Sequence, residues 1–245
     1  MIERQVEIRT AGGAMSTFVV HPDRGGPFPV ILFFMDAPGI REELRDMARR
    51  FATTGTYVML PNMYYRAGVN ELGPLPADPE APARKRMYEL MDSLTIPLVM
   101  DDAAALLSFA ETDPMARPGS TGAVGYCMSG RYAINAAARF PSQVRAAASI
   151  YGVRLVMDEP DSPHVVCATS KAELYFACAE TDRWMPSDQI DVLKSSLASQ
   201  PVKAEVEVFP GTEHGFAFPQ RPVYRKVAAE QHWERLNTLF RRNLG

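Results

Sequence analysis

The spacing of hydrophobic residues changes along the chain between two patterns, and each pattern predicts a different element. Short continuous apolar runs flanked by turn residues are typical of strands buried on both faces of a sheet. Such runs lie at residues 29–35, 57–60, 121–125, 146–150, 174–178 and 202–209. Apolar residues three and four positions apart predict helices at residues 44–51, 84–94, 99–110, 131–139 and 187–198, and a last helix that begins around Pro222.

The order of these elements indicates the fold class. Residues 6–8 and 17–20 predict an opening hairpin, and strands then alternate with helices to the last residues. Such alternation is typical of an α/β fold with a mostly parallel twisted sheet and helices on both faces. No repeat or linker interrupts it, so we expect a single domain over residues 1–245. Residues 64–83 are rich in Pro and Gly and predict a long surface excursion.

Composition and charge exclude several classes of partner. Apolar residues make up 47% and charged residues 22% of the chain, the balance of a soluble globular protein. A net charge of −3 gives no basic surface, so we expect no nucleic-acid partner. The longest apolar run, residues 30–35, is too short to cross a bilayer, and residues 1–10 lack the apolar core of a secretory signal. We therefore expect a cytoplasmic protein with no membrane partner.

The cysteines and histidines give no support to a metal site or a cofactor. Three cysteines without a CxxC motif argue against a disulfide framework and favour a reducing compartment. None of the four histidines stands at metal-binding spacing, and the chain has no glycine-rich nucleotide motif. We expect neither a metal nor a cofactor.

The segment Gly125-Tyr126-Cys127-Met128-Ser129-Gly130 lies at a predicted strand-to-helix junction. An α/β-hydrolase places its nucleophile at such a junction, in a sharp turn, and the following backbone N–H faces the developing oxyanion. Cys127 is therefore the candidate nucleophile and the Met128 N–H a candidate oxyanion donor, although Ser129 stands where the usual pattern has glycine. A buried structural role for Cys127 is the alternative. Two weaker candidates, one in no clear element and one inside a strand, are Cys167 and Cys178.

Candidates for the base and the acid follow two later strands. His214 comes after the last predicted strand, and Glu180 and Asp182 both come after the strand before it. We favour Asp182, which lies farther out of its strand. Because parallel strands end at one edge of a sheet, Cys127, Asp182 and His214 should lie together, in the chain order of α/β-hydrolases. His214 would take the thiol proton, Asp182 would hold the imidazole, and attack on a carbonyl would form a thioester that water hydrolyses. The histidines that fit less well are His21, His164 and His232.

These residues resemble the dienelactone hydrolase (carboxymethylenebutenolidase) family. The resemblance extends from about residue 29 to residue 244. It is carried by Gly125-Tyr126-Cys127, residues 179–182, Glu213-His214-Gly215-Phe216 and residues 57–66. It implies an α/β-hydrolase fold, a cysteine triad, no cofactor, and a small-molecule ester or lactone as substrate.

The loop after the first buried strand is expected to serve the same reaction. The second oxyanion donor should be a backbone N–H near Ala37. The resemblance implies a further role for Asp36, because the family carries a glutamate there that holds the resting thiol. Aspartate is one methylene shorter than glutamate, so this contact is expected to be longer or bridged by water.

The resemblance also implies a pocket in which two arginines grip a substrate carboxylate. Arg84 resembles the first arginine, while Tyr88, one helical turn beyond it, and Tyr151 resemble pocket residues. The position of the second arginine holds Phe218, and Arg221 is an alternative. Since Phe218 cannot donate a hydrogen bond, we expect neutral esters or lactones to be processed at least as well as carboxylate-bearing ones.

Three other functions stay open on the sequence alone. An acyl transferase or lyase would use the same thioester with an acceptor other than water. A non-hydrolytic binding protein would keep the fold without turnover. A redox-sensing thiol would need a resolving cysteine, and none lies near Cys127 in the chain. The protein is expected to be a monomer or a small homo-oligomer.

Overall fold

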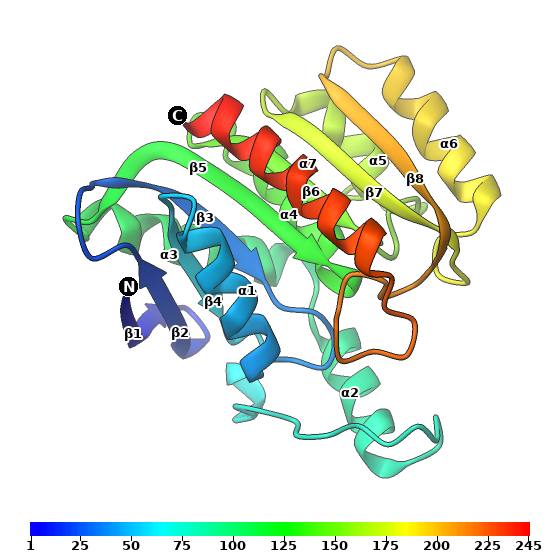
Figure 1. The fold of residues 1–245 in the computed structure, drawn as a ribbon, viewed down its shortest axis with the longest axis horizontal. Helices are drawn as coiled ribbons and strands as arrows, with labels where there is room; N and C mark the ends of the chain where they lie inside the picture. Colours follow the sequence, from blue (N-terminus) through cyan, green and yellow to red (C-terminus); the bar gives the residue numbers. More distant parts are fainter. The chain divides into compact units, whose positions relative to one another are not determined.

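The structure is a computed structural model that describes residues Met1–Gly245. Contacts between residues divide the chain into two compact units, Met1–Pro118 and Gly119–Gly245. Both units combine strands with helices (Figure 1). The prediction of a single domain stays a prediction.

The first unit opens with the predicted hairpin. Strands β1 (Ile2–Thr10) and β2 (Gly13–His21) pair antiparallel, and β2 pairs antiparallel with β4 (Tyr57–Pro61). Strand β3 (Phe28–Phe34) pairs parallel with β4, so the order is β1-β2-β4-β3. Every residue of β4 is buried, because helices α1 (Glu42–Ala52) and α3 (Ile96–Thr112) cover the strands of this unit.

The predicted surface excursion is present between β4 and helix α2 (Pro82–Ser93). After the 3₁₀ turn η1 (Tyr65–Ala67), residues 68–81 form neither helix nor strand and are mostly exposed. The Pro and Gly content of this stretch explains its irregular path, since neither residue continues a helix or strand readily. Residues 68–81 are called the excursion segment below.

The second unit is a parallel sheet covered on both faces. Its strands lie in the order β5 (Ala116–Tyr126), β6 (Val144–Ile150), β7 (Glu173–Thr181) and β8 (Ala204–Glu213), and each neighbouring pair is parallel. Helix α4 (Gly130–Arg139) packs on one face and α7 (Lys226–Leu244) on the other (Figure 1). The order and direction of these strands confirm the predicted α/β class with a mostly parallel sheet.

Some boundaries differ from the prediction. Strands β7 and β8 continue past Cys178 and Phe209 to Thr181 and Glu213, although the apolar pattern has already ended. Helix α7 begins at Lys226, so the predicted start around Pro222 was wrong, because residues 214–225 are held in consecutive turns. The short helical turns α5 (Pro163–Val166), η2 (Cys127–Ser129) and η3 (Cys167–Thr169) contain too few residues to show a helical period.

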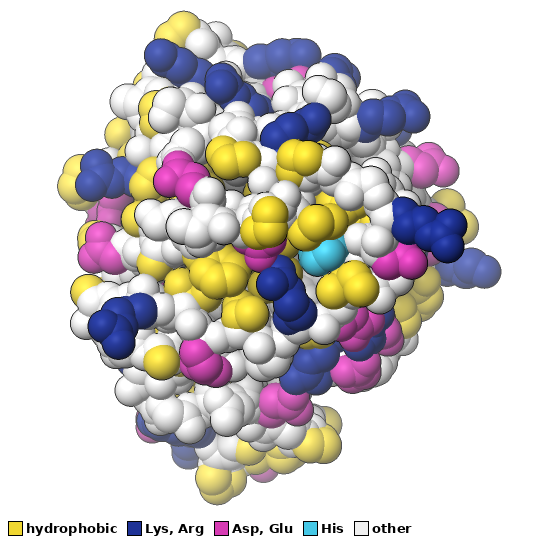
Figure 2. All heavy atoms as spheres, turned by 90° about the vertical axis from the view of Figure 1, so that its left-hand side faces the viewer, with side chains coloured by type: hydrophobic (Ala, Val, Ile, Leu, Met, Phe, Trp, Pro, Cys, Tyr) yellow, Lys and Arg dark blue, Asp and Glu magenta, His cyan; other side chains and the backbone are white.

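No single helix has both the length and the apolar character needed to cross a bilayer. Helices α2 and α3 meet these two criteria only when taken together, and they are bent by 77° at their junction. On the face shown in Figure 2, basic side chains lie among acidic and hydrophobic ones, and no continuous basic stripe crosses it.

A buried carboxylate joins three elements of the first unit. Asp113, which follows α3, accepts hydrogen bonds from the Arg4 guanidinium of β1, the Tyr57 hydroxyl of β4 and the Met115 backbone N–H. Its side chain is only 4% exposed. Burial alone would raise the pKa of Asp113, but these three donors lower it below its usual value.

Asp113→Asn should therefore destabilise the protein, by about 1–3 kcal/mol at neutral pH. Because the folded-state pKa of Asp113 is lowered, its stabilisation is complete above the unfolded-state pKa of about 4 and is lost as the pH falls through the folded-state value. Urea unfolding of both proteins at neutral and acidic pH measures this difference. Glu7→Gln, on the exposed side of β1, is the control. A difference that does not shrink in acid would contradict the role of the charge.

Candidate active site

The register between β7 and β8 brings an acid and a histidine together. Thr181 lies opposite Glu213 in the last pair of this parallel ladder, so the next residues, Asp182 and His214, leave the sheet side by side. The Asp182 carboxylate accepts a hydrogen bond from His214, with 2.7 Å between Oδ2 and Nδ1. The second carboxylate oxygen accepts the Trp184 backbone N–H at 2.9 Å. Asp182 is thus fixed by two donors and orients the imidazole.

The alternative acid, Glu180, has a different task. Ala179 and Thr181 of β7 pair with Phe209 and Glu213 of β8. Strand β8 therefore has two extra residues in this interval, and they form a bulge. The Glu180 side chain accepts the Gly211 N–H at 2.9 Å, and the Glu180 N–H donates to the Thr212 hydroxyl at 3.3 Å. Glu180 therefore stabilises the bulge that sets His214 level with Asp182.

The remaining histidines form local hydrogen bonds elsewhere. His21 contacts the carbonyl of the next proline, His164 contacts the Ser162 hydroxyl, and His232 contacts the Tyr126 hydroxyl from a fully buried position. These partners are a carbonyl and two hydroxyls rather than carboxylates. His214 is thus the histidine that has a carboxylate orienting it.

Cys127 occupies a sharp turn between β5 and α4. Its φ angle is 55°, in the left-handed region that non-glycine residues rarely adopt. The turn also brings the chain back on itself, because a Cβ on Gly125 would lie 2.0 Å from the Ser129 carbonyl oxygen. The predicted requirement for small residues is therefore met by Gly125, while Ser129, at the position where glycine is usual, is fully buried. This strain matches the sharp nucleophile turn of the α/β-hydrolase fold.

Two further glycines let α4 approach β6 closely below this turn. A Cβ on Gly130 would lie 2.2 Å from the Ser149 hydroxyl and 2.7 Å from the Cα of Gly152. The Ser149 hydroxyl is buried and has no hydrogen-bond partner, so its role here is to pack against Gly130 and Gly152. The register of β5 with β6, in which Tyr126 lies opposite Ile150, places the start of this turn next to the end of β6.

The three thiols differ in accessibility. Cys127 is partly exposed, whereas Cys167 and Cys178 are buried. Burial raises the pKa of both buried thiols to about 12, which leaves them protonated at neutral pH. Of the three, Cys127 is the thiol that a substrate can reach.

The charge state of His214 depends on Cys127 and Asp182. Burial alone would lower its pKa, but the negative charge of a Cys127 thiolate and the hydrogen bond with Asp182 raise it to about 10. The other ring nitrogen, Nε2, is buried and has no partner at conventional hydrogen-bond geometry. His214 can therefore stay protonated at neutral pH, and its pKa depends on the charge of Cys127. Hydrogen bonds between catalytic groups often shorten only when substrate binds.

A cluster of aromatic side chains packs against the His214 imidazole. The Tyr151 ring packs edge-on against His214 with 5.1 Å between ring centroids, and Tyr151 also contacts Phe218 at 6.1 Å. Phe218 is fully buried, and the Arg221 guanidinium lies 5.1 Å above its ring. A Cβ on Gly215 would come within 2.9 Å of Arg221 Cδ, so Arg221 also packs against the residue that follows His214. Arg221, rather than Phe218, is the partly exposed residue here.

Asp36, Ala37, Arg84 and Tyr88 lie in the first unit, whereas the three candidate triad residues lie in the second. Asp36 is fully buried, and its carboxylate receives both terminal nitrogens of Arg41, at 2.5 and 3.1 Å. Arg41 also binds Glu43 and the Gly39 carbonyl. The Ala37 carbonyl accepts the Tyr64 hydroxyl at 2.8 Å. These contacts stabilise the loop after β3, and the roles of Asp36 and Ala37 in the reaction stay predictions.

Arg84 and Tyr88 lie one turn apart on α2, and both are partly exposed. Arg84 donates from Nε to the Pro76 carbonyl at 2.7 Å. No hydrogen bond or ion pair joins its two terminal nitrogens to another residue. Their planar pair of N–H groups matches the geometry of a carboxylate.

Sequence reasoning missed one residue and left another undecided. Arg41 was not singled out, although an arginine five residues from Asp36, just before a helix, is well spaced to fold back onto that carboxylate. Arg221 was left as an alternative, because only the turns of residues 214–225 show that it returns to Gly215. No group of three or more His, Cys, Asp or Glu side chains is arranged to hold a metal ion.

Comparison with known proteins gives consistent relatives. Residues 15–244 match the model of the "Dienelactone hydrolase family". The chain is 30% identical to a "Putative carboxymethylenebutenolidase" of Methylorubrum extorquens, over 98% of this chain and 81% of that protein. It is 27% identical to a protein of the same name from Synechocystis, over 93% of this chain and 91% of the relative. The crystal structure of a "Putative Dienelactone Hydrolase" from Klebsiella pneumoniae superposes with a TM-score of 0.87 at 23% identity, covering 98% of both chains.

Gly130→Ala should lower the free energy of unfolding by about 1–3 kcal/mol, because the added methyl group overpacks the contact between α4 and β6. The nearest obstacle is the Ser149 hydroxyl, so the same substitution in a Ser149→Ala background should cost less. Ser149→Ala alone is the control and should be nearly neutral, since its hydroxyl has no partner. Thermal unfolding of the four proteins measures this. Equal costs in both backgrounds would show that Ser149 is not the obstacle.

Proposed function

Because this chain belongs to the dienelactone hydrolase family, we propose that it hydrolyses small carboxylic esters or lactones with Cys127 as nucleophile, His214 as base and acid, and Asp182 as the residue that orients His214. The observation that carries this proposal is the 2.7 Å hydrogen bond between Asp182 and His214, whose pKa is also raised by the charge of Cys127 and by a hydrogen bond with it. Their strands belong to the same parallel sheet as the strand that ends in the strained turn of Cys127.

The first half of the reaction forms a thioester. The Cys127 sulfur attacks the carbonyl carbon, and the electron pair of the C=O bond moves to the oxygen. As the tetrahedral intermediate collapses, the bond to the alcohol oxygen breaks, and His214 Nε2 donates the proton that this oxygen needs. For a lactone, the released alcohol stays attached to the acyl group.

The second half returns the enzyme to its starting state. His214, now neutral, takes a proton from water, and the resulting hydroxide attacks the thioester carbonyl. Collapse of this second intermediate releases the carboxylic acid and the Cys127 thiolate. Asp182 stabilises the imidazolium in both halves without accepting its proton.

Backbone donors stabilise the negative oxygen of both intermediates. The Met128 N–H follows the nucleophile at the start of a helical turn, the position that this fold uses for one donor. The Ala37 N–H is the proposed second donor. Each such donor is worth about 10²–10³ in kcat.

Arg84 is the group proposed to hold a carboxylate on the substrate. The two unpaired terminal nitrogens of Arg84 fit a carboxylate on the acyl or alcohol portion, and Tyr88 lies one turn away on the same helix. Phe218 and Tyr151 have no exposed surface; Phe218 packs against Tyr151, and Tyr151 packs against His214. With only one guanidinium in the position that the family resemblance implies, neutral esters and lactones are substrates as well.

Replacing the three cysteines one at a time tests the nucleophile. Cys127→Ala should abolish hydrolysis of an aryl ester while the protein stays folded. Cys167→Ala and Cys178→Ala should retain most activity, because both thiols are buried and protonated, and should lose only some stability. Release of the phenol measures turnover, and analysis of the acyl product separates hydrolysis from transfer to another acceptor. Near-normal turnover by Cys127→Ala would rule out the mechanism.

A matched pair of substitutions tests the acid. Asp182→Asn should reduce kcat/KM by about 10²–10⁴, because the imidazole loses the group that orients it and stabilises its charge. Glu180→Gln removes a neighbouring charge but keeps an acceptor for Gly211, so it should change kcat/KM by less than about threefold. A loss of activity in Glu180→Gln comparable to that in Asp182→Asn would show that the two acids have been assigned wrongly.

The same pair predicts a difference in the titration of His214. Asp182 contributes to the raised pKa of His214, about 10, beside the contribution of Cys127. Asp182→Asn should therefore lower the His214 pKa, whereas Glu180→Gln should leave it unchanged. NMR titration of the His214 ring protons measures both. An unchanged His214 pKa in Asp182→Asn would contradict the pairing of the imidazole with this carboxylate.

A further inference from the structure

Three side chains hold the excursion segment, two near its start and one near its middle. The Asn62 side-chain amide donates to the Val69 carbonyl at 2.8 Å. Arg45 of α1 forms an ion pair with Glu71, and Arg84 of α2 donates to the Pro76 carbonyl at 2.7 Å. The segment therefore joins an arginine on α1 to the arginine that the proposed function assigns to the substrate.

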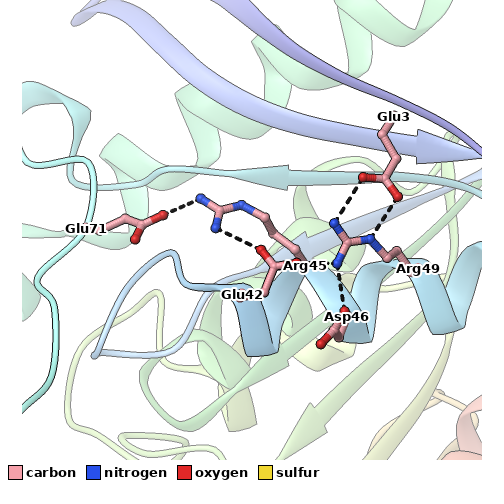
Figure 3. A network of polar contacts seen from close by, with 6 residues as sticks. All are labelled: Glu3, Glu42, Arg45, Asp46, Arg49 and Glu71. Atoms are coloured by element: carbon pink, nitrogen blue, oxygen red, sulfur yellow. Dashed lines mark hydrogen bonds and ion pairs between the residues drawn. The ribbon is translucent and has the colours of Figure 1, made fainter.

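Arg45 is itself fixed by a network of charges. Figure 3 shows Arg45 between Glu71 and Glu42, and Arg49 one turn farther along α1 beside Asp46 and Glu3. Arg49 also pairs with Glu42. Glu42 binds both Arg45 and Arg49, and Arg49 binds Glu3 of β1. The ion pair that holds the excursion segment is therefore connected to β1.

Little apolar packing supports the segment where Glu71 meets α1. A cavity of about 220 Å³ lies there, lined by residues that include Asn70, Glu71, Arg45, Phe18 and Leu60. An open space of this kind provides no dispersion contacts between its walls. The ion pair therefore contributes a larger share of what holds this part of the segment than it would over a packed surface.

The middle of the segment, at Pro76, contacts Arg84 directly. The Pro76 carbonyl engages Nε and leaves the two terminal nitrogens facing away from the hydrogen bond, since one planar guanidinium carries all three groups. A carbonyl at a fixed position thus sets the orientation of the pair of N–H groups. If the segment shifts, this orientation is lost while Arg84 stays on its helix.

We propose that Arg45 and Glu71 are specificity-determining positioning residues: their ion pair holds the excursion segment, and through the Pro76 carbonyl it orients the Arg84 guanidinium toward a carboxylate on the substrate. This inference rests on the proposed function. It assigns a role to a contact on α1 that touches neither the substrate nor the reacting atoms.

The experiment compares two p-nitrophenyl esters of similar length, a neutral butyrate and a hemisuccinate that carries a carboxylate. Glu71→Gln should raise KM for the hemisuccinate about 2- to 5-fold, the range expected for a partly exposed ion pair, with kcat changed less than twofold. KM for the butyrate should not change. The double exchange Arg45→Glu with Glu71→Arg should restore the hemisuccinate KM.

Asp46→Asn is the matched control. Asp46 lies on the same helix and pairs with Arg49, but it does not contact the excursion segment, and its side chain is 70% exposed. Its substitution should leave both KM values unchanged. Equal KM changes for the two esters in Glu71→Gln would overturn the inference, because a merely structural role of the ion pair predicts that result. An unchanged KM for both esters would overturn it as well, because it would show that the ion pair has no role.

A second measurement separates failure of this inference from failure of the proposed function. Amide hydrogen exchange of residues 69–81 should become faster in Glu71→Gln and stay unchanged in Asp46→Asn, whether or not any ester is hydrolysed. If wild-type protein hydrolyses neither ester, the proposed function fails. If both esters are hydrolysed and Arg84→Ala leaves the hemisuccinate KM unchanged, the inference fails while the hydrolase proposal stands.

Discussion

The parallel ladder between β7 and β8 is the constraint on which the candidate active site depends. Backbone hydrogen bonds fix Thr181 opposite Glu213, and the two residues that follow can then meet without a mobile loop. The bulge in β8 makes this possible, because it advances that strand by two residues relative to β7. Glu180 and Thr212 satisfy the backbone groups that the bulge would otherwise leave unpaired. A buried carboxylate can then hold the imidazole in one orientation.

The three thiols of the chain differ in their properties because they lie in different elements. Cys178 lies within β7 and Cys167 within a buried helical turn, and both lose contact with water, which favours their neutral form. Cys127 lies one residue beyond a strand end, where the chain turns and the side chain keeps partial access to solvent. Position relative to the strand end, rather than residue type, thus decides which thiol keeps access to solvent.

The fold and the contact of Asp182 with His214 could be predicted because each depends on short-range pattern. Buried parallel strands give continuous apolar runs, and the residues just beyond them lie at one edge. The choice between Glu180 and Asp182 depended on the bulge, which arises from residues in the neighbouring strand and leaves no periodic signal. The turns of residues 214–225, which return Arg221 to Gly215, are likewise set by backbone hydrogen bonds between residues close in sequence but irregular in spacing. Arg45 and Glu71 are separated by an irregular segment, so no pattern in the chain relates them.

The left-handed backbone of Cys127 sets two selection pressures against each other. At a φ angle of 55° a side chain is strained by about 1–3 kcal/mol, and glycine is the residue that avoids this cost. Selection for thermal resistance alone would therefore drive this position toward glycine, which has no sulfur. Under the proposed mechanism, selection for turnover retains a residue that its own backbone disfavours. The stability of the surrounding sheet and helix, through contacts such as that of Gly130 with Ser149, is what allows a lineage to keep the thiol.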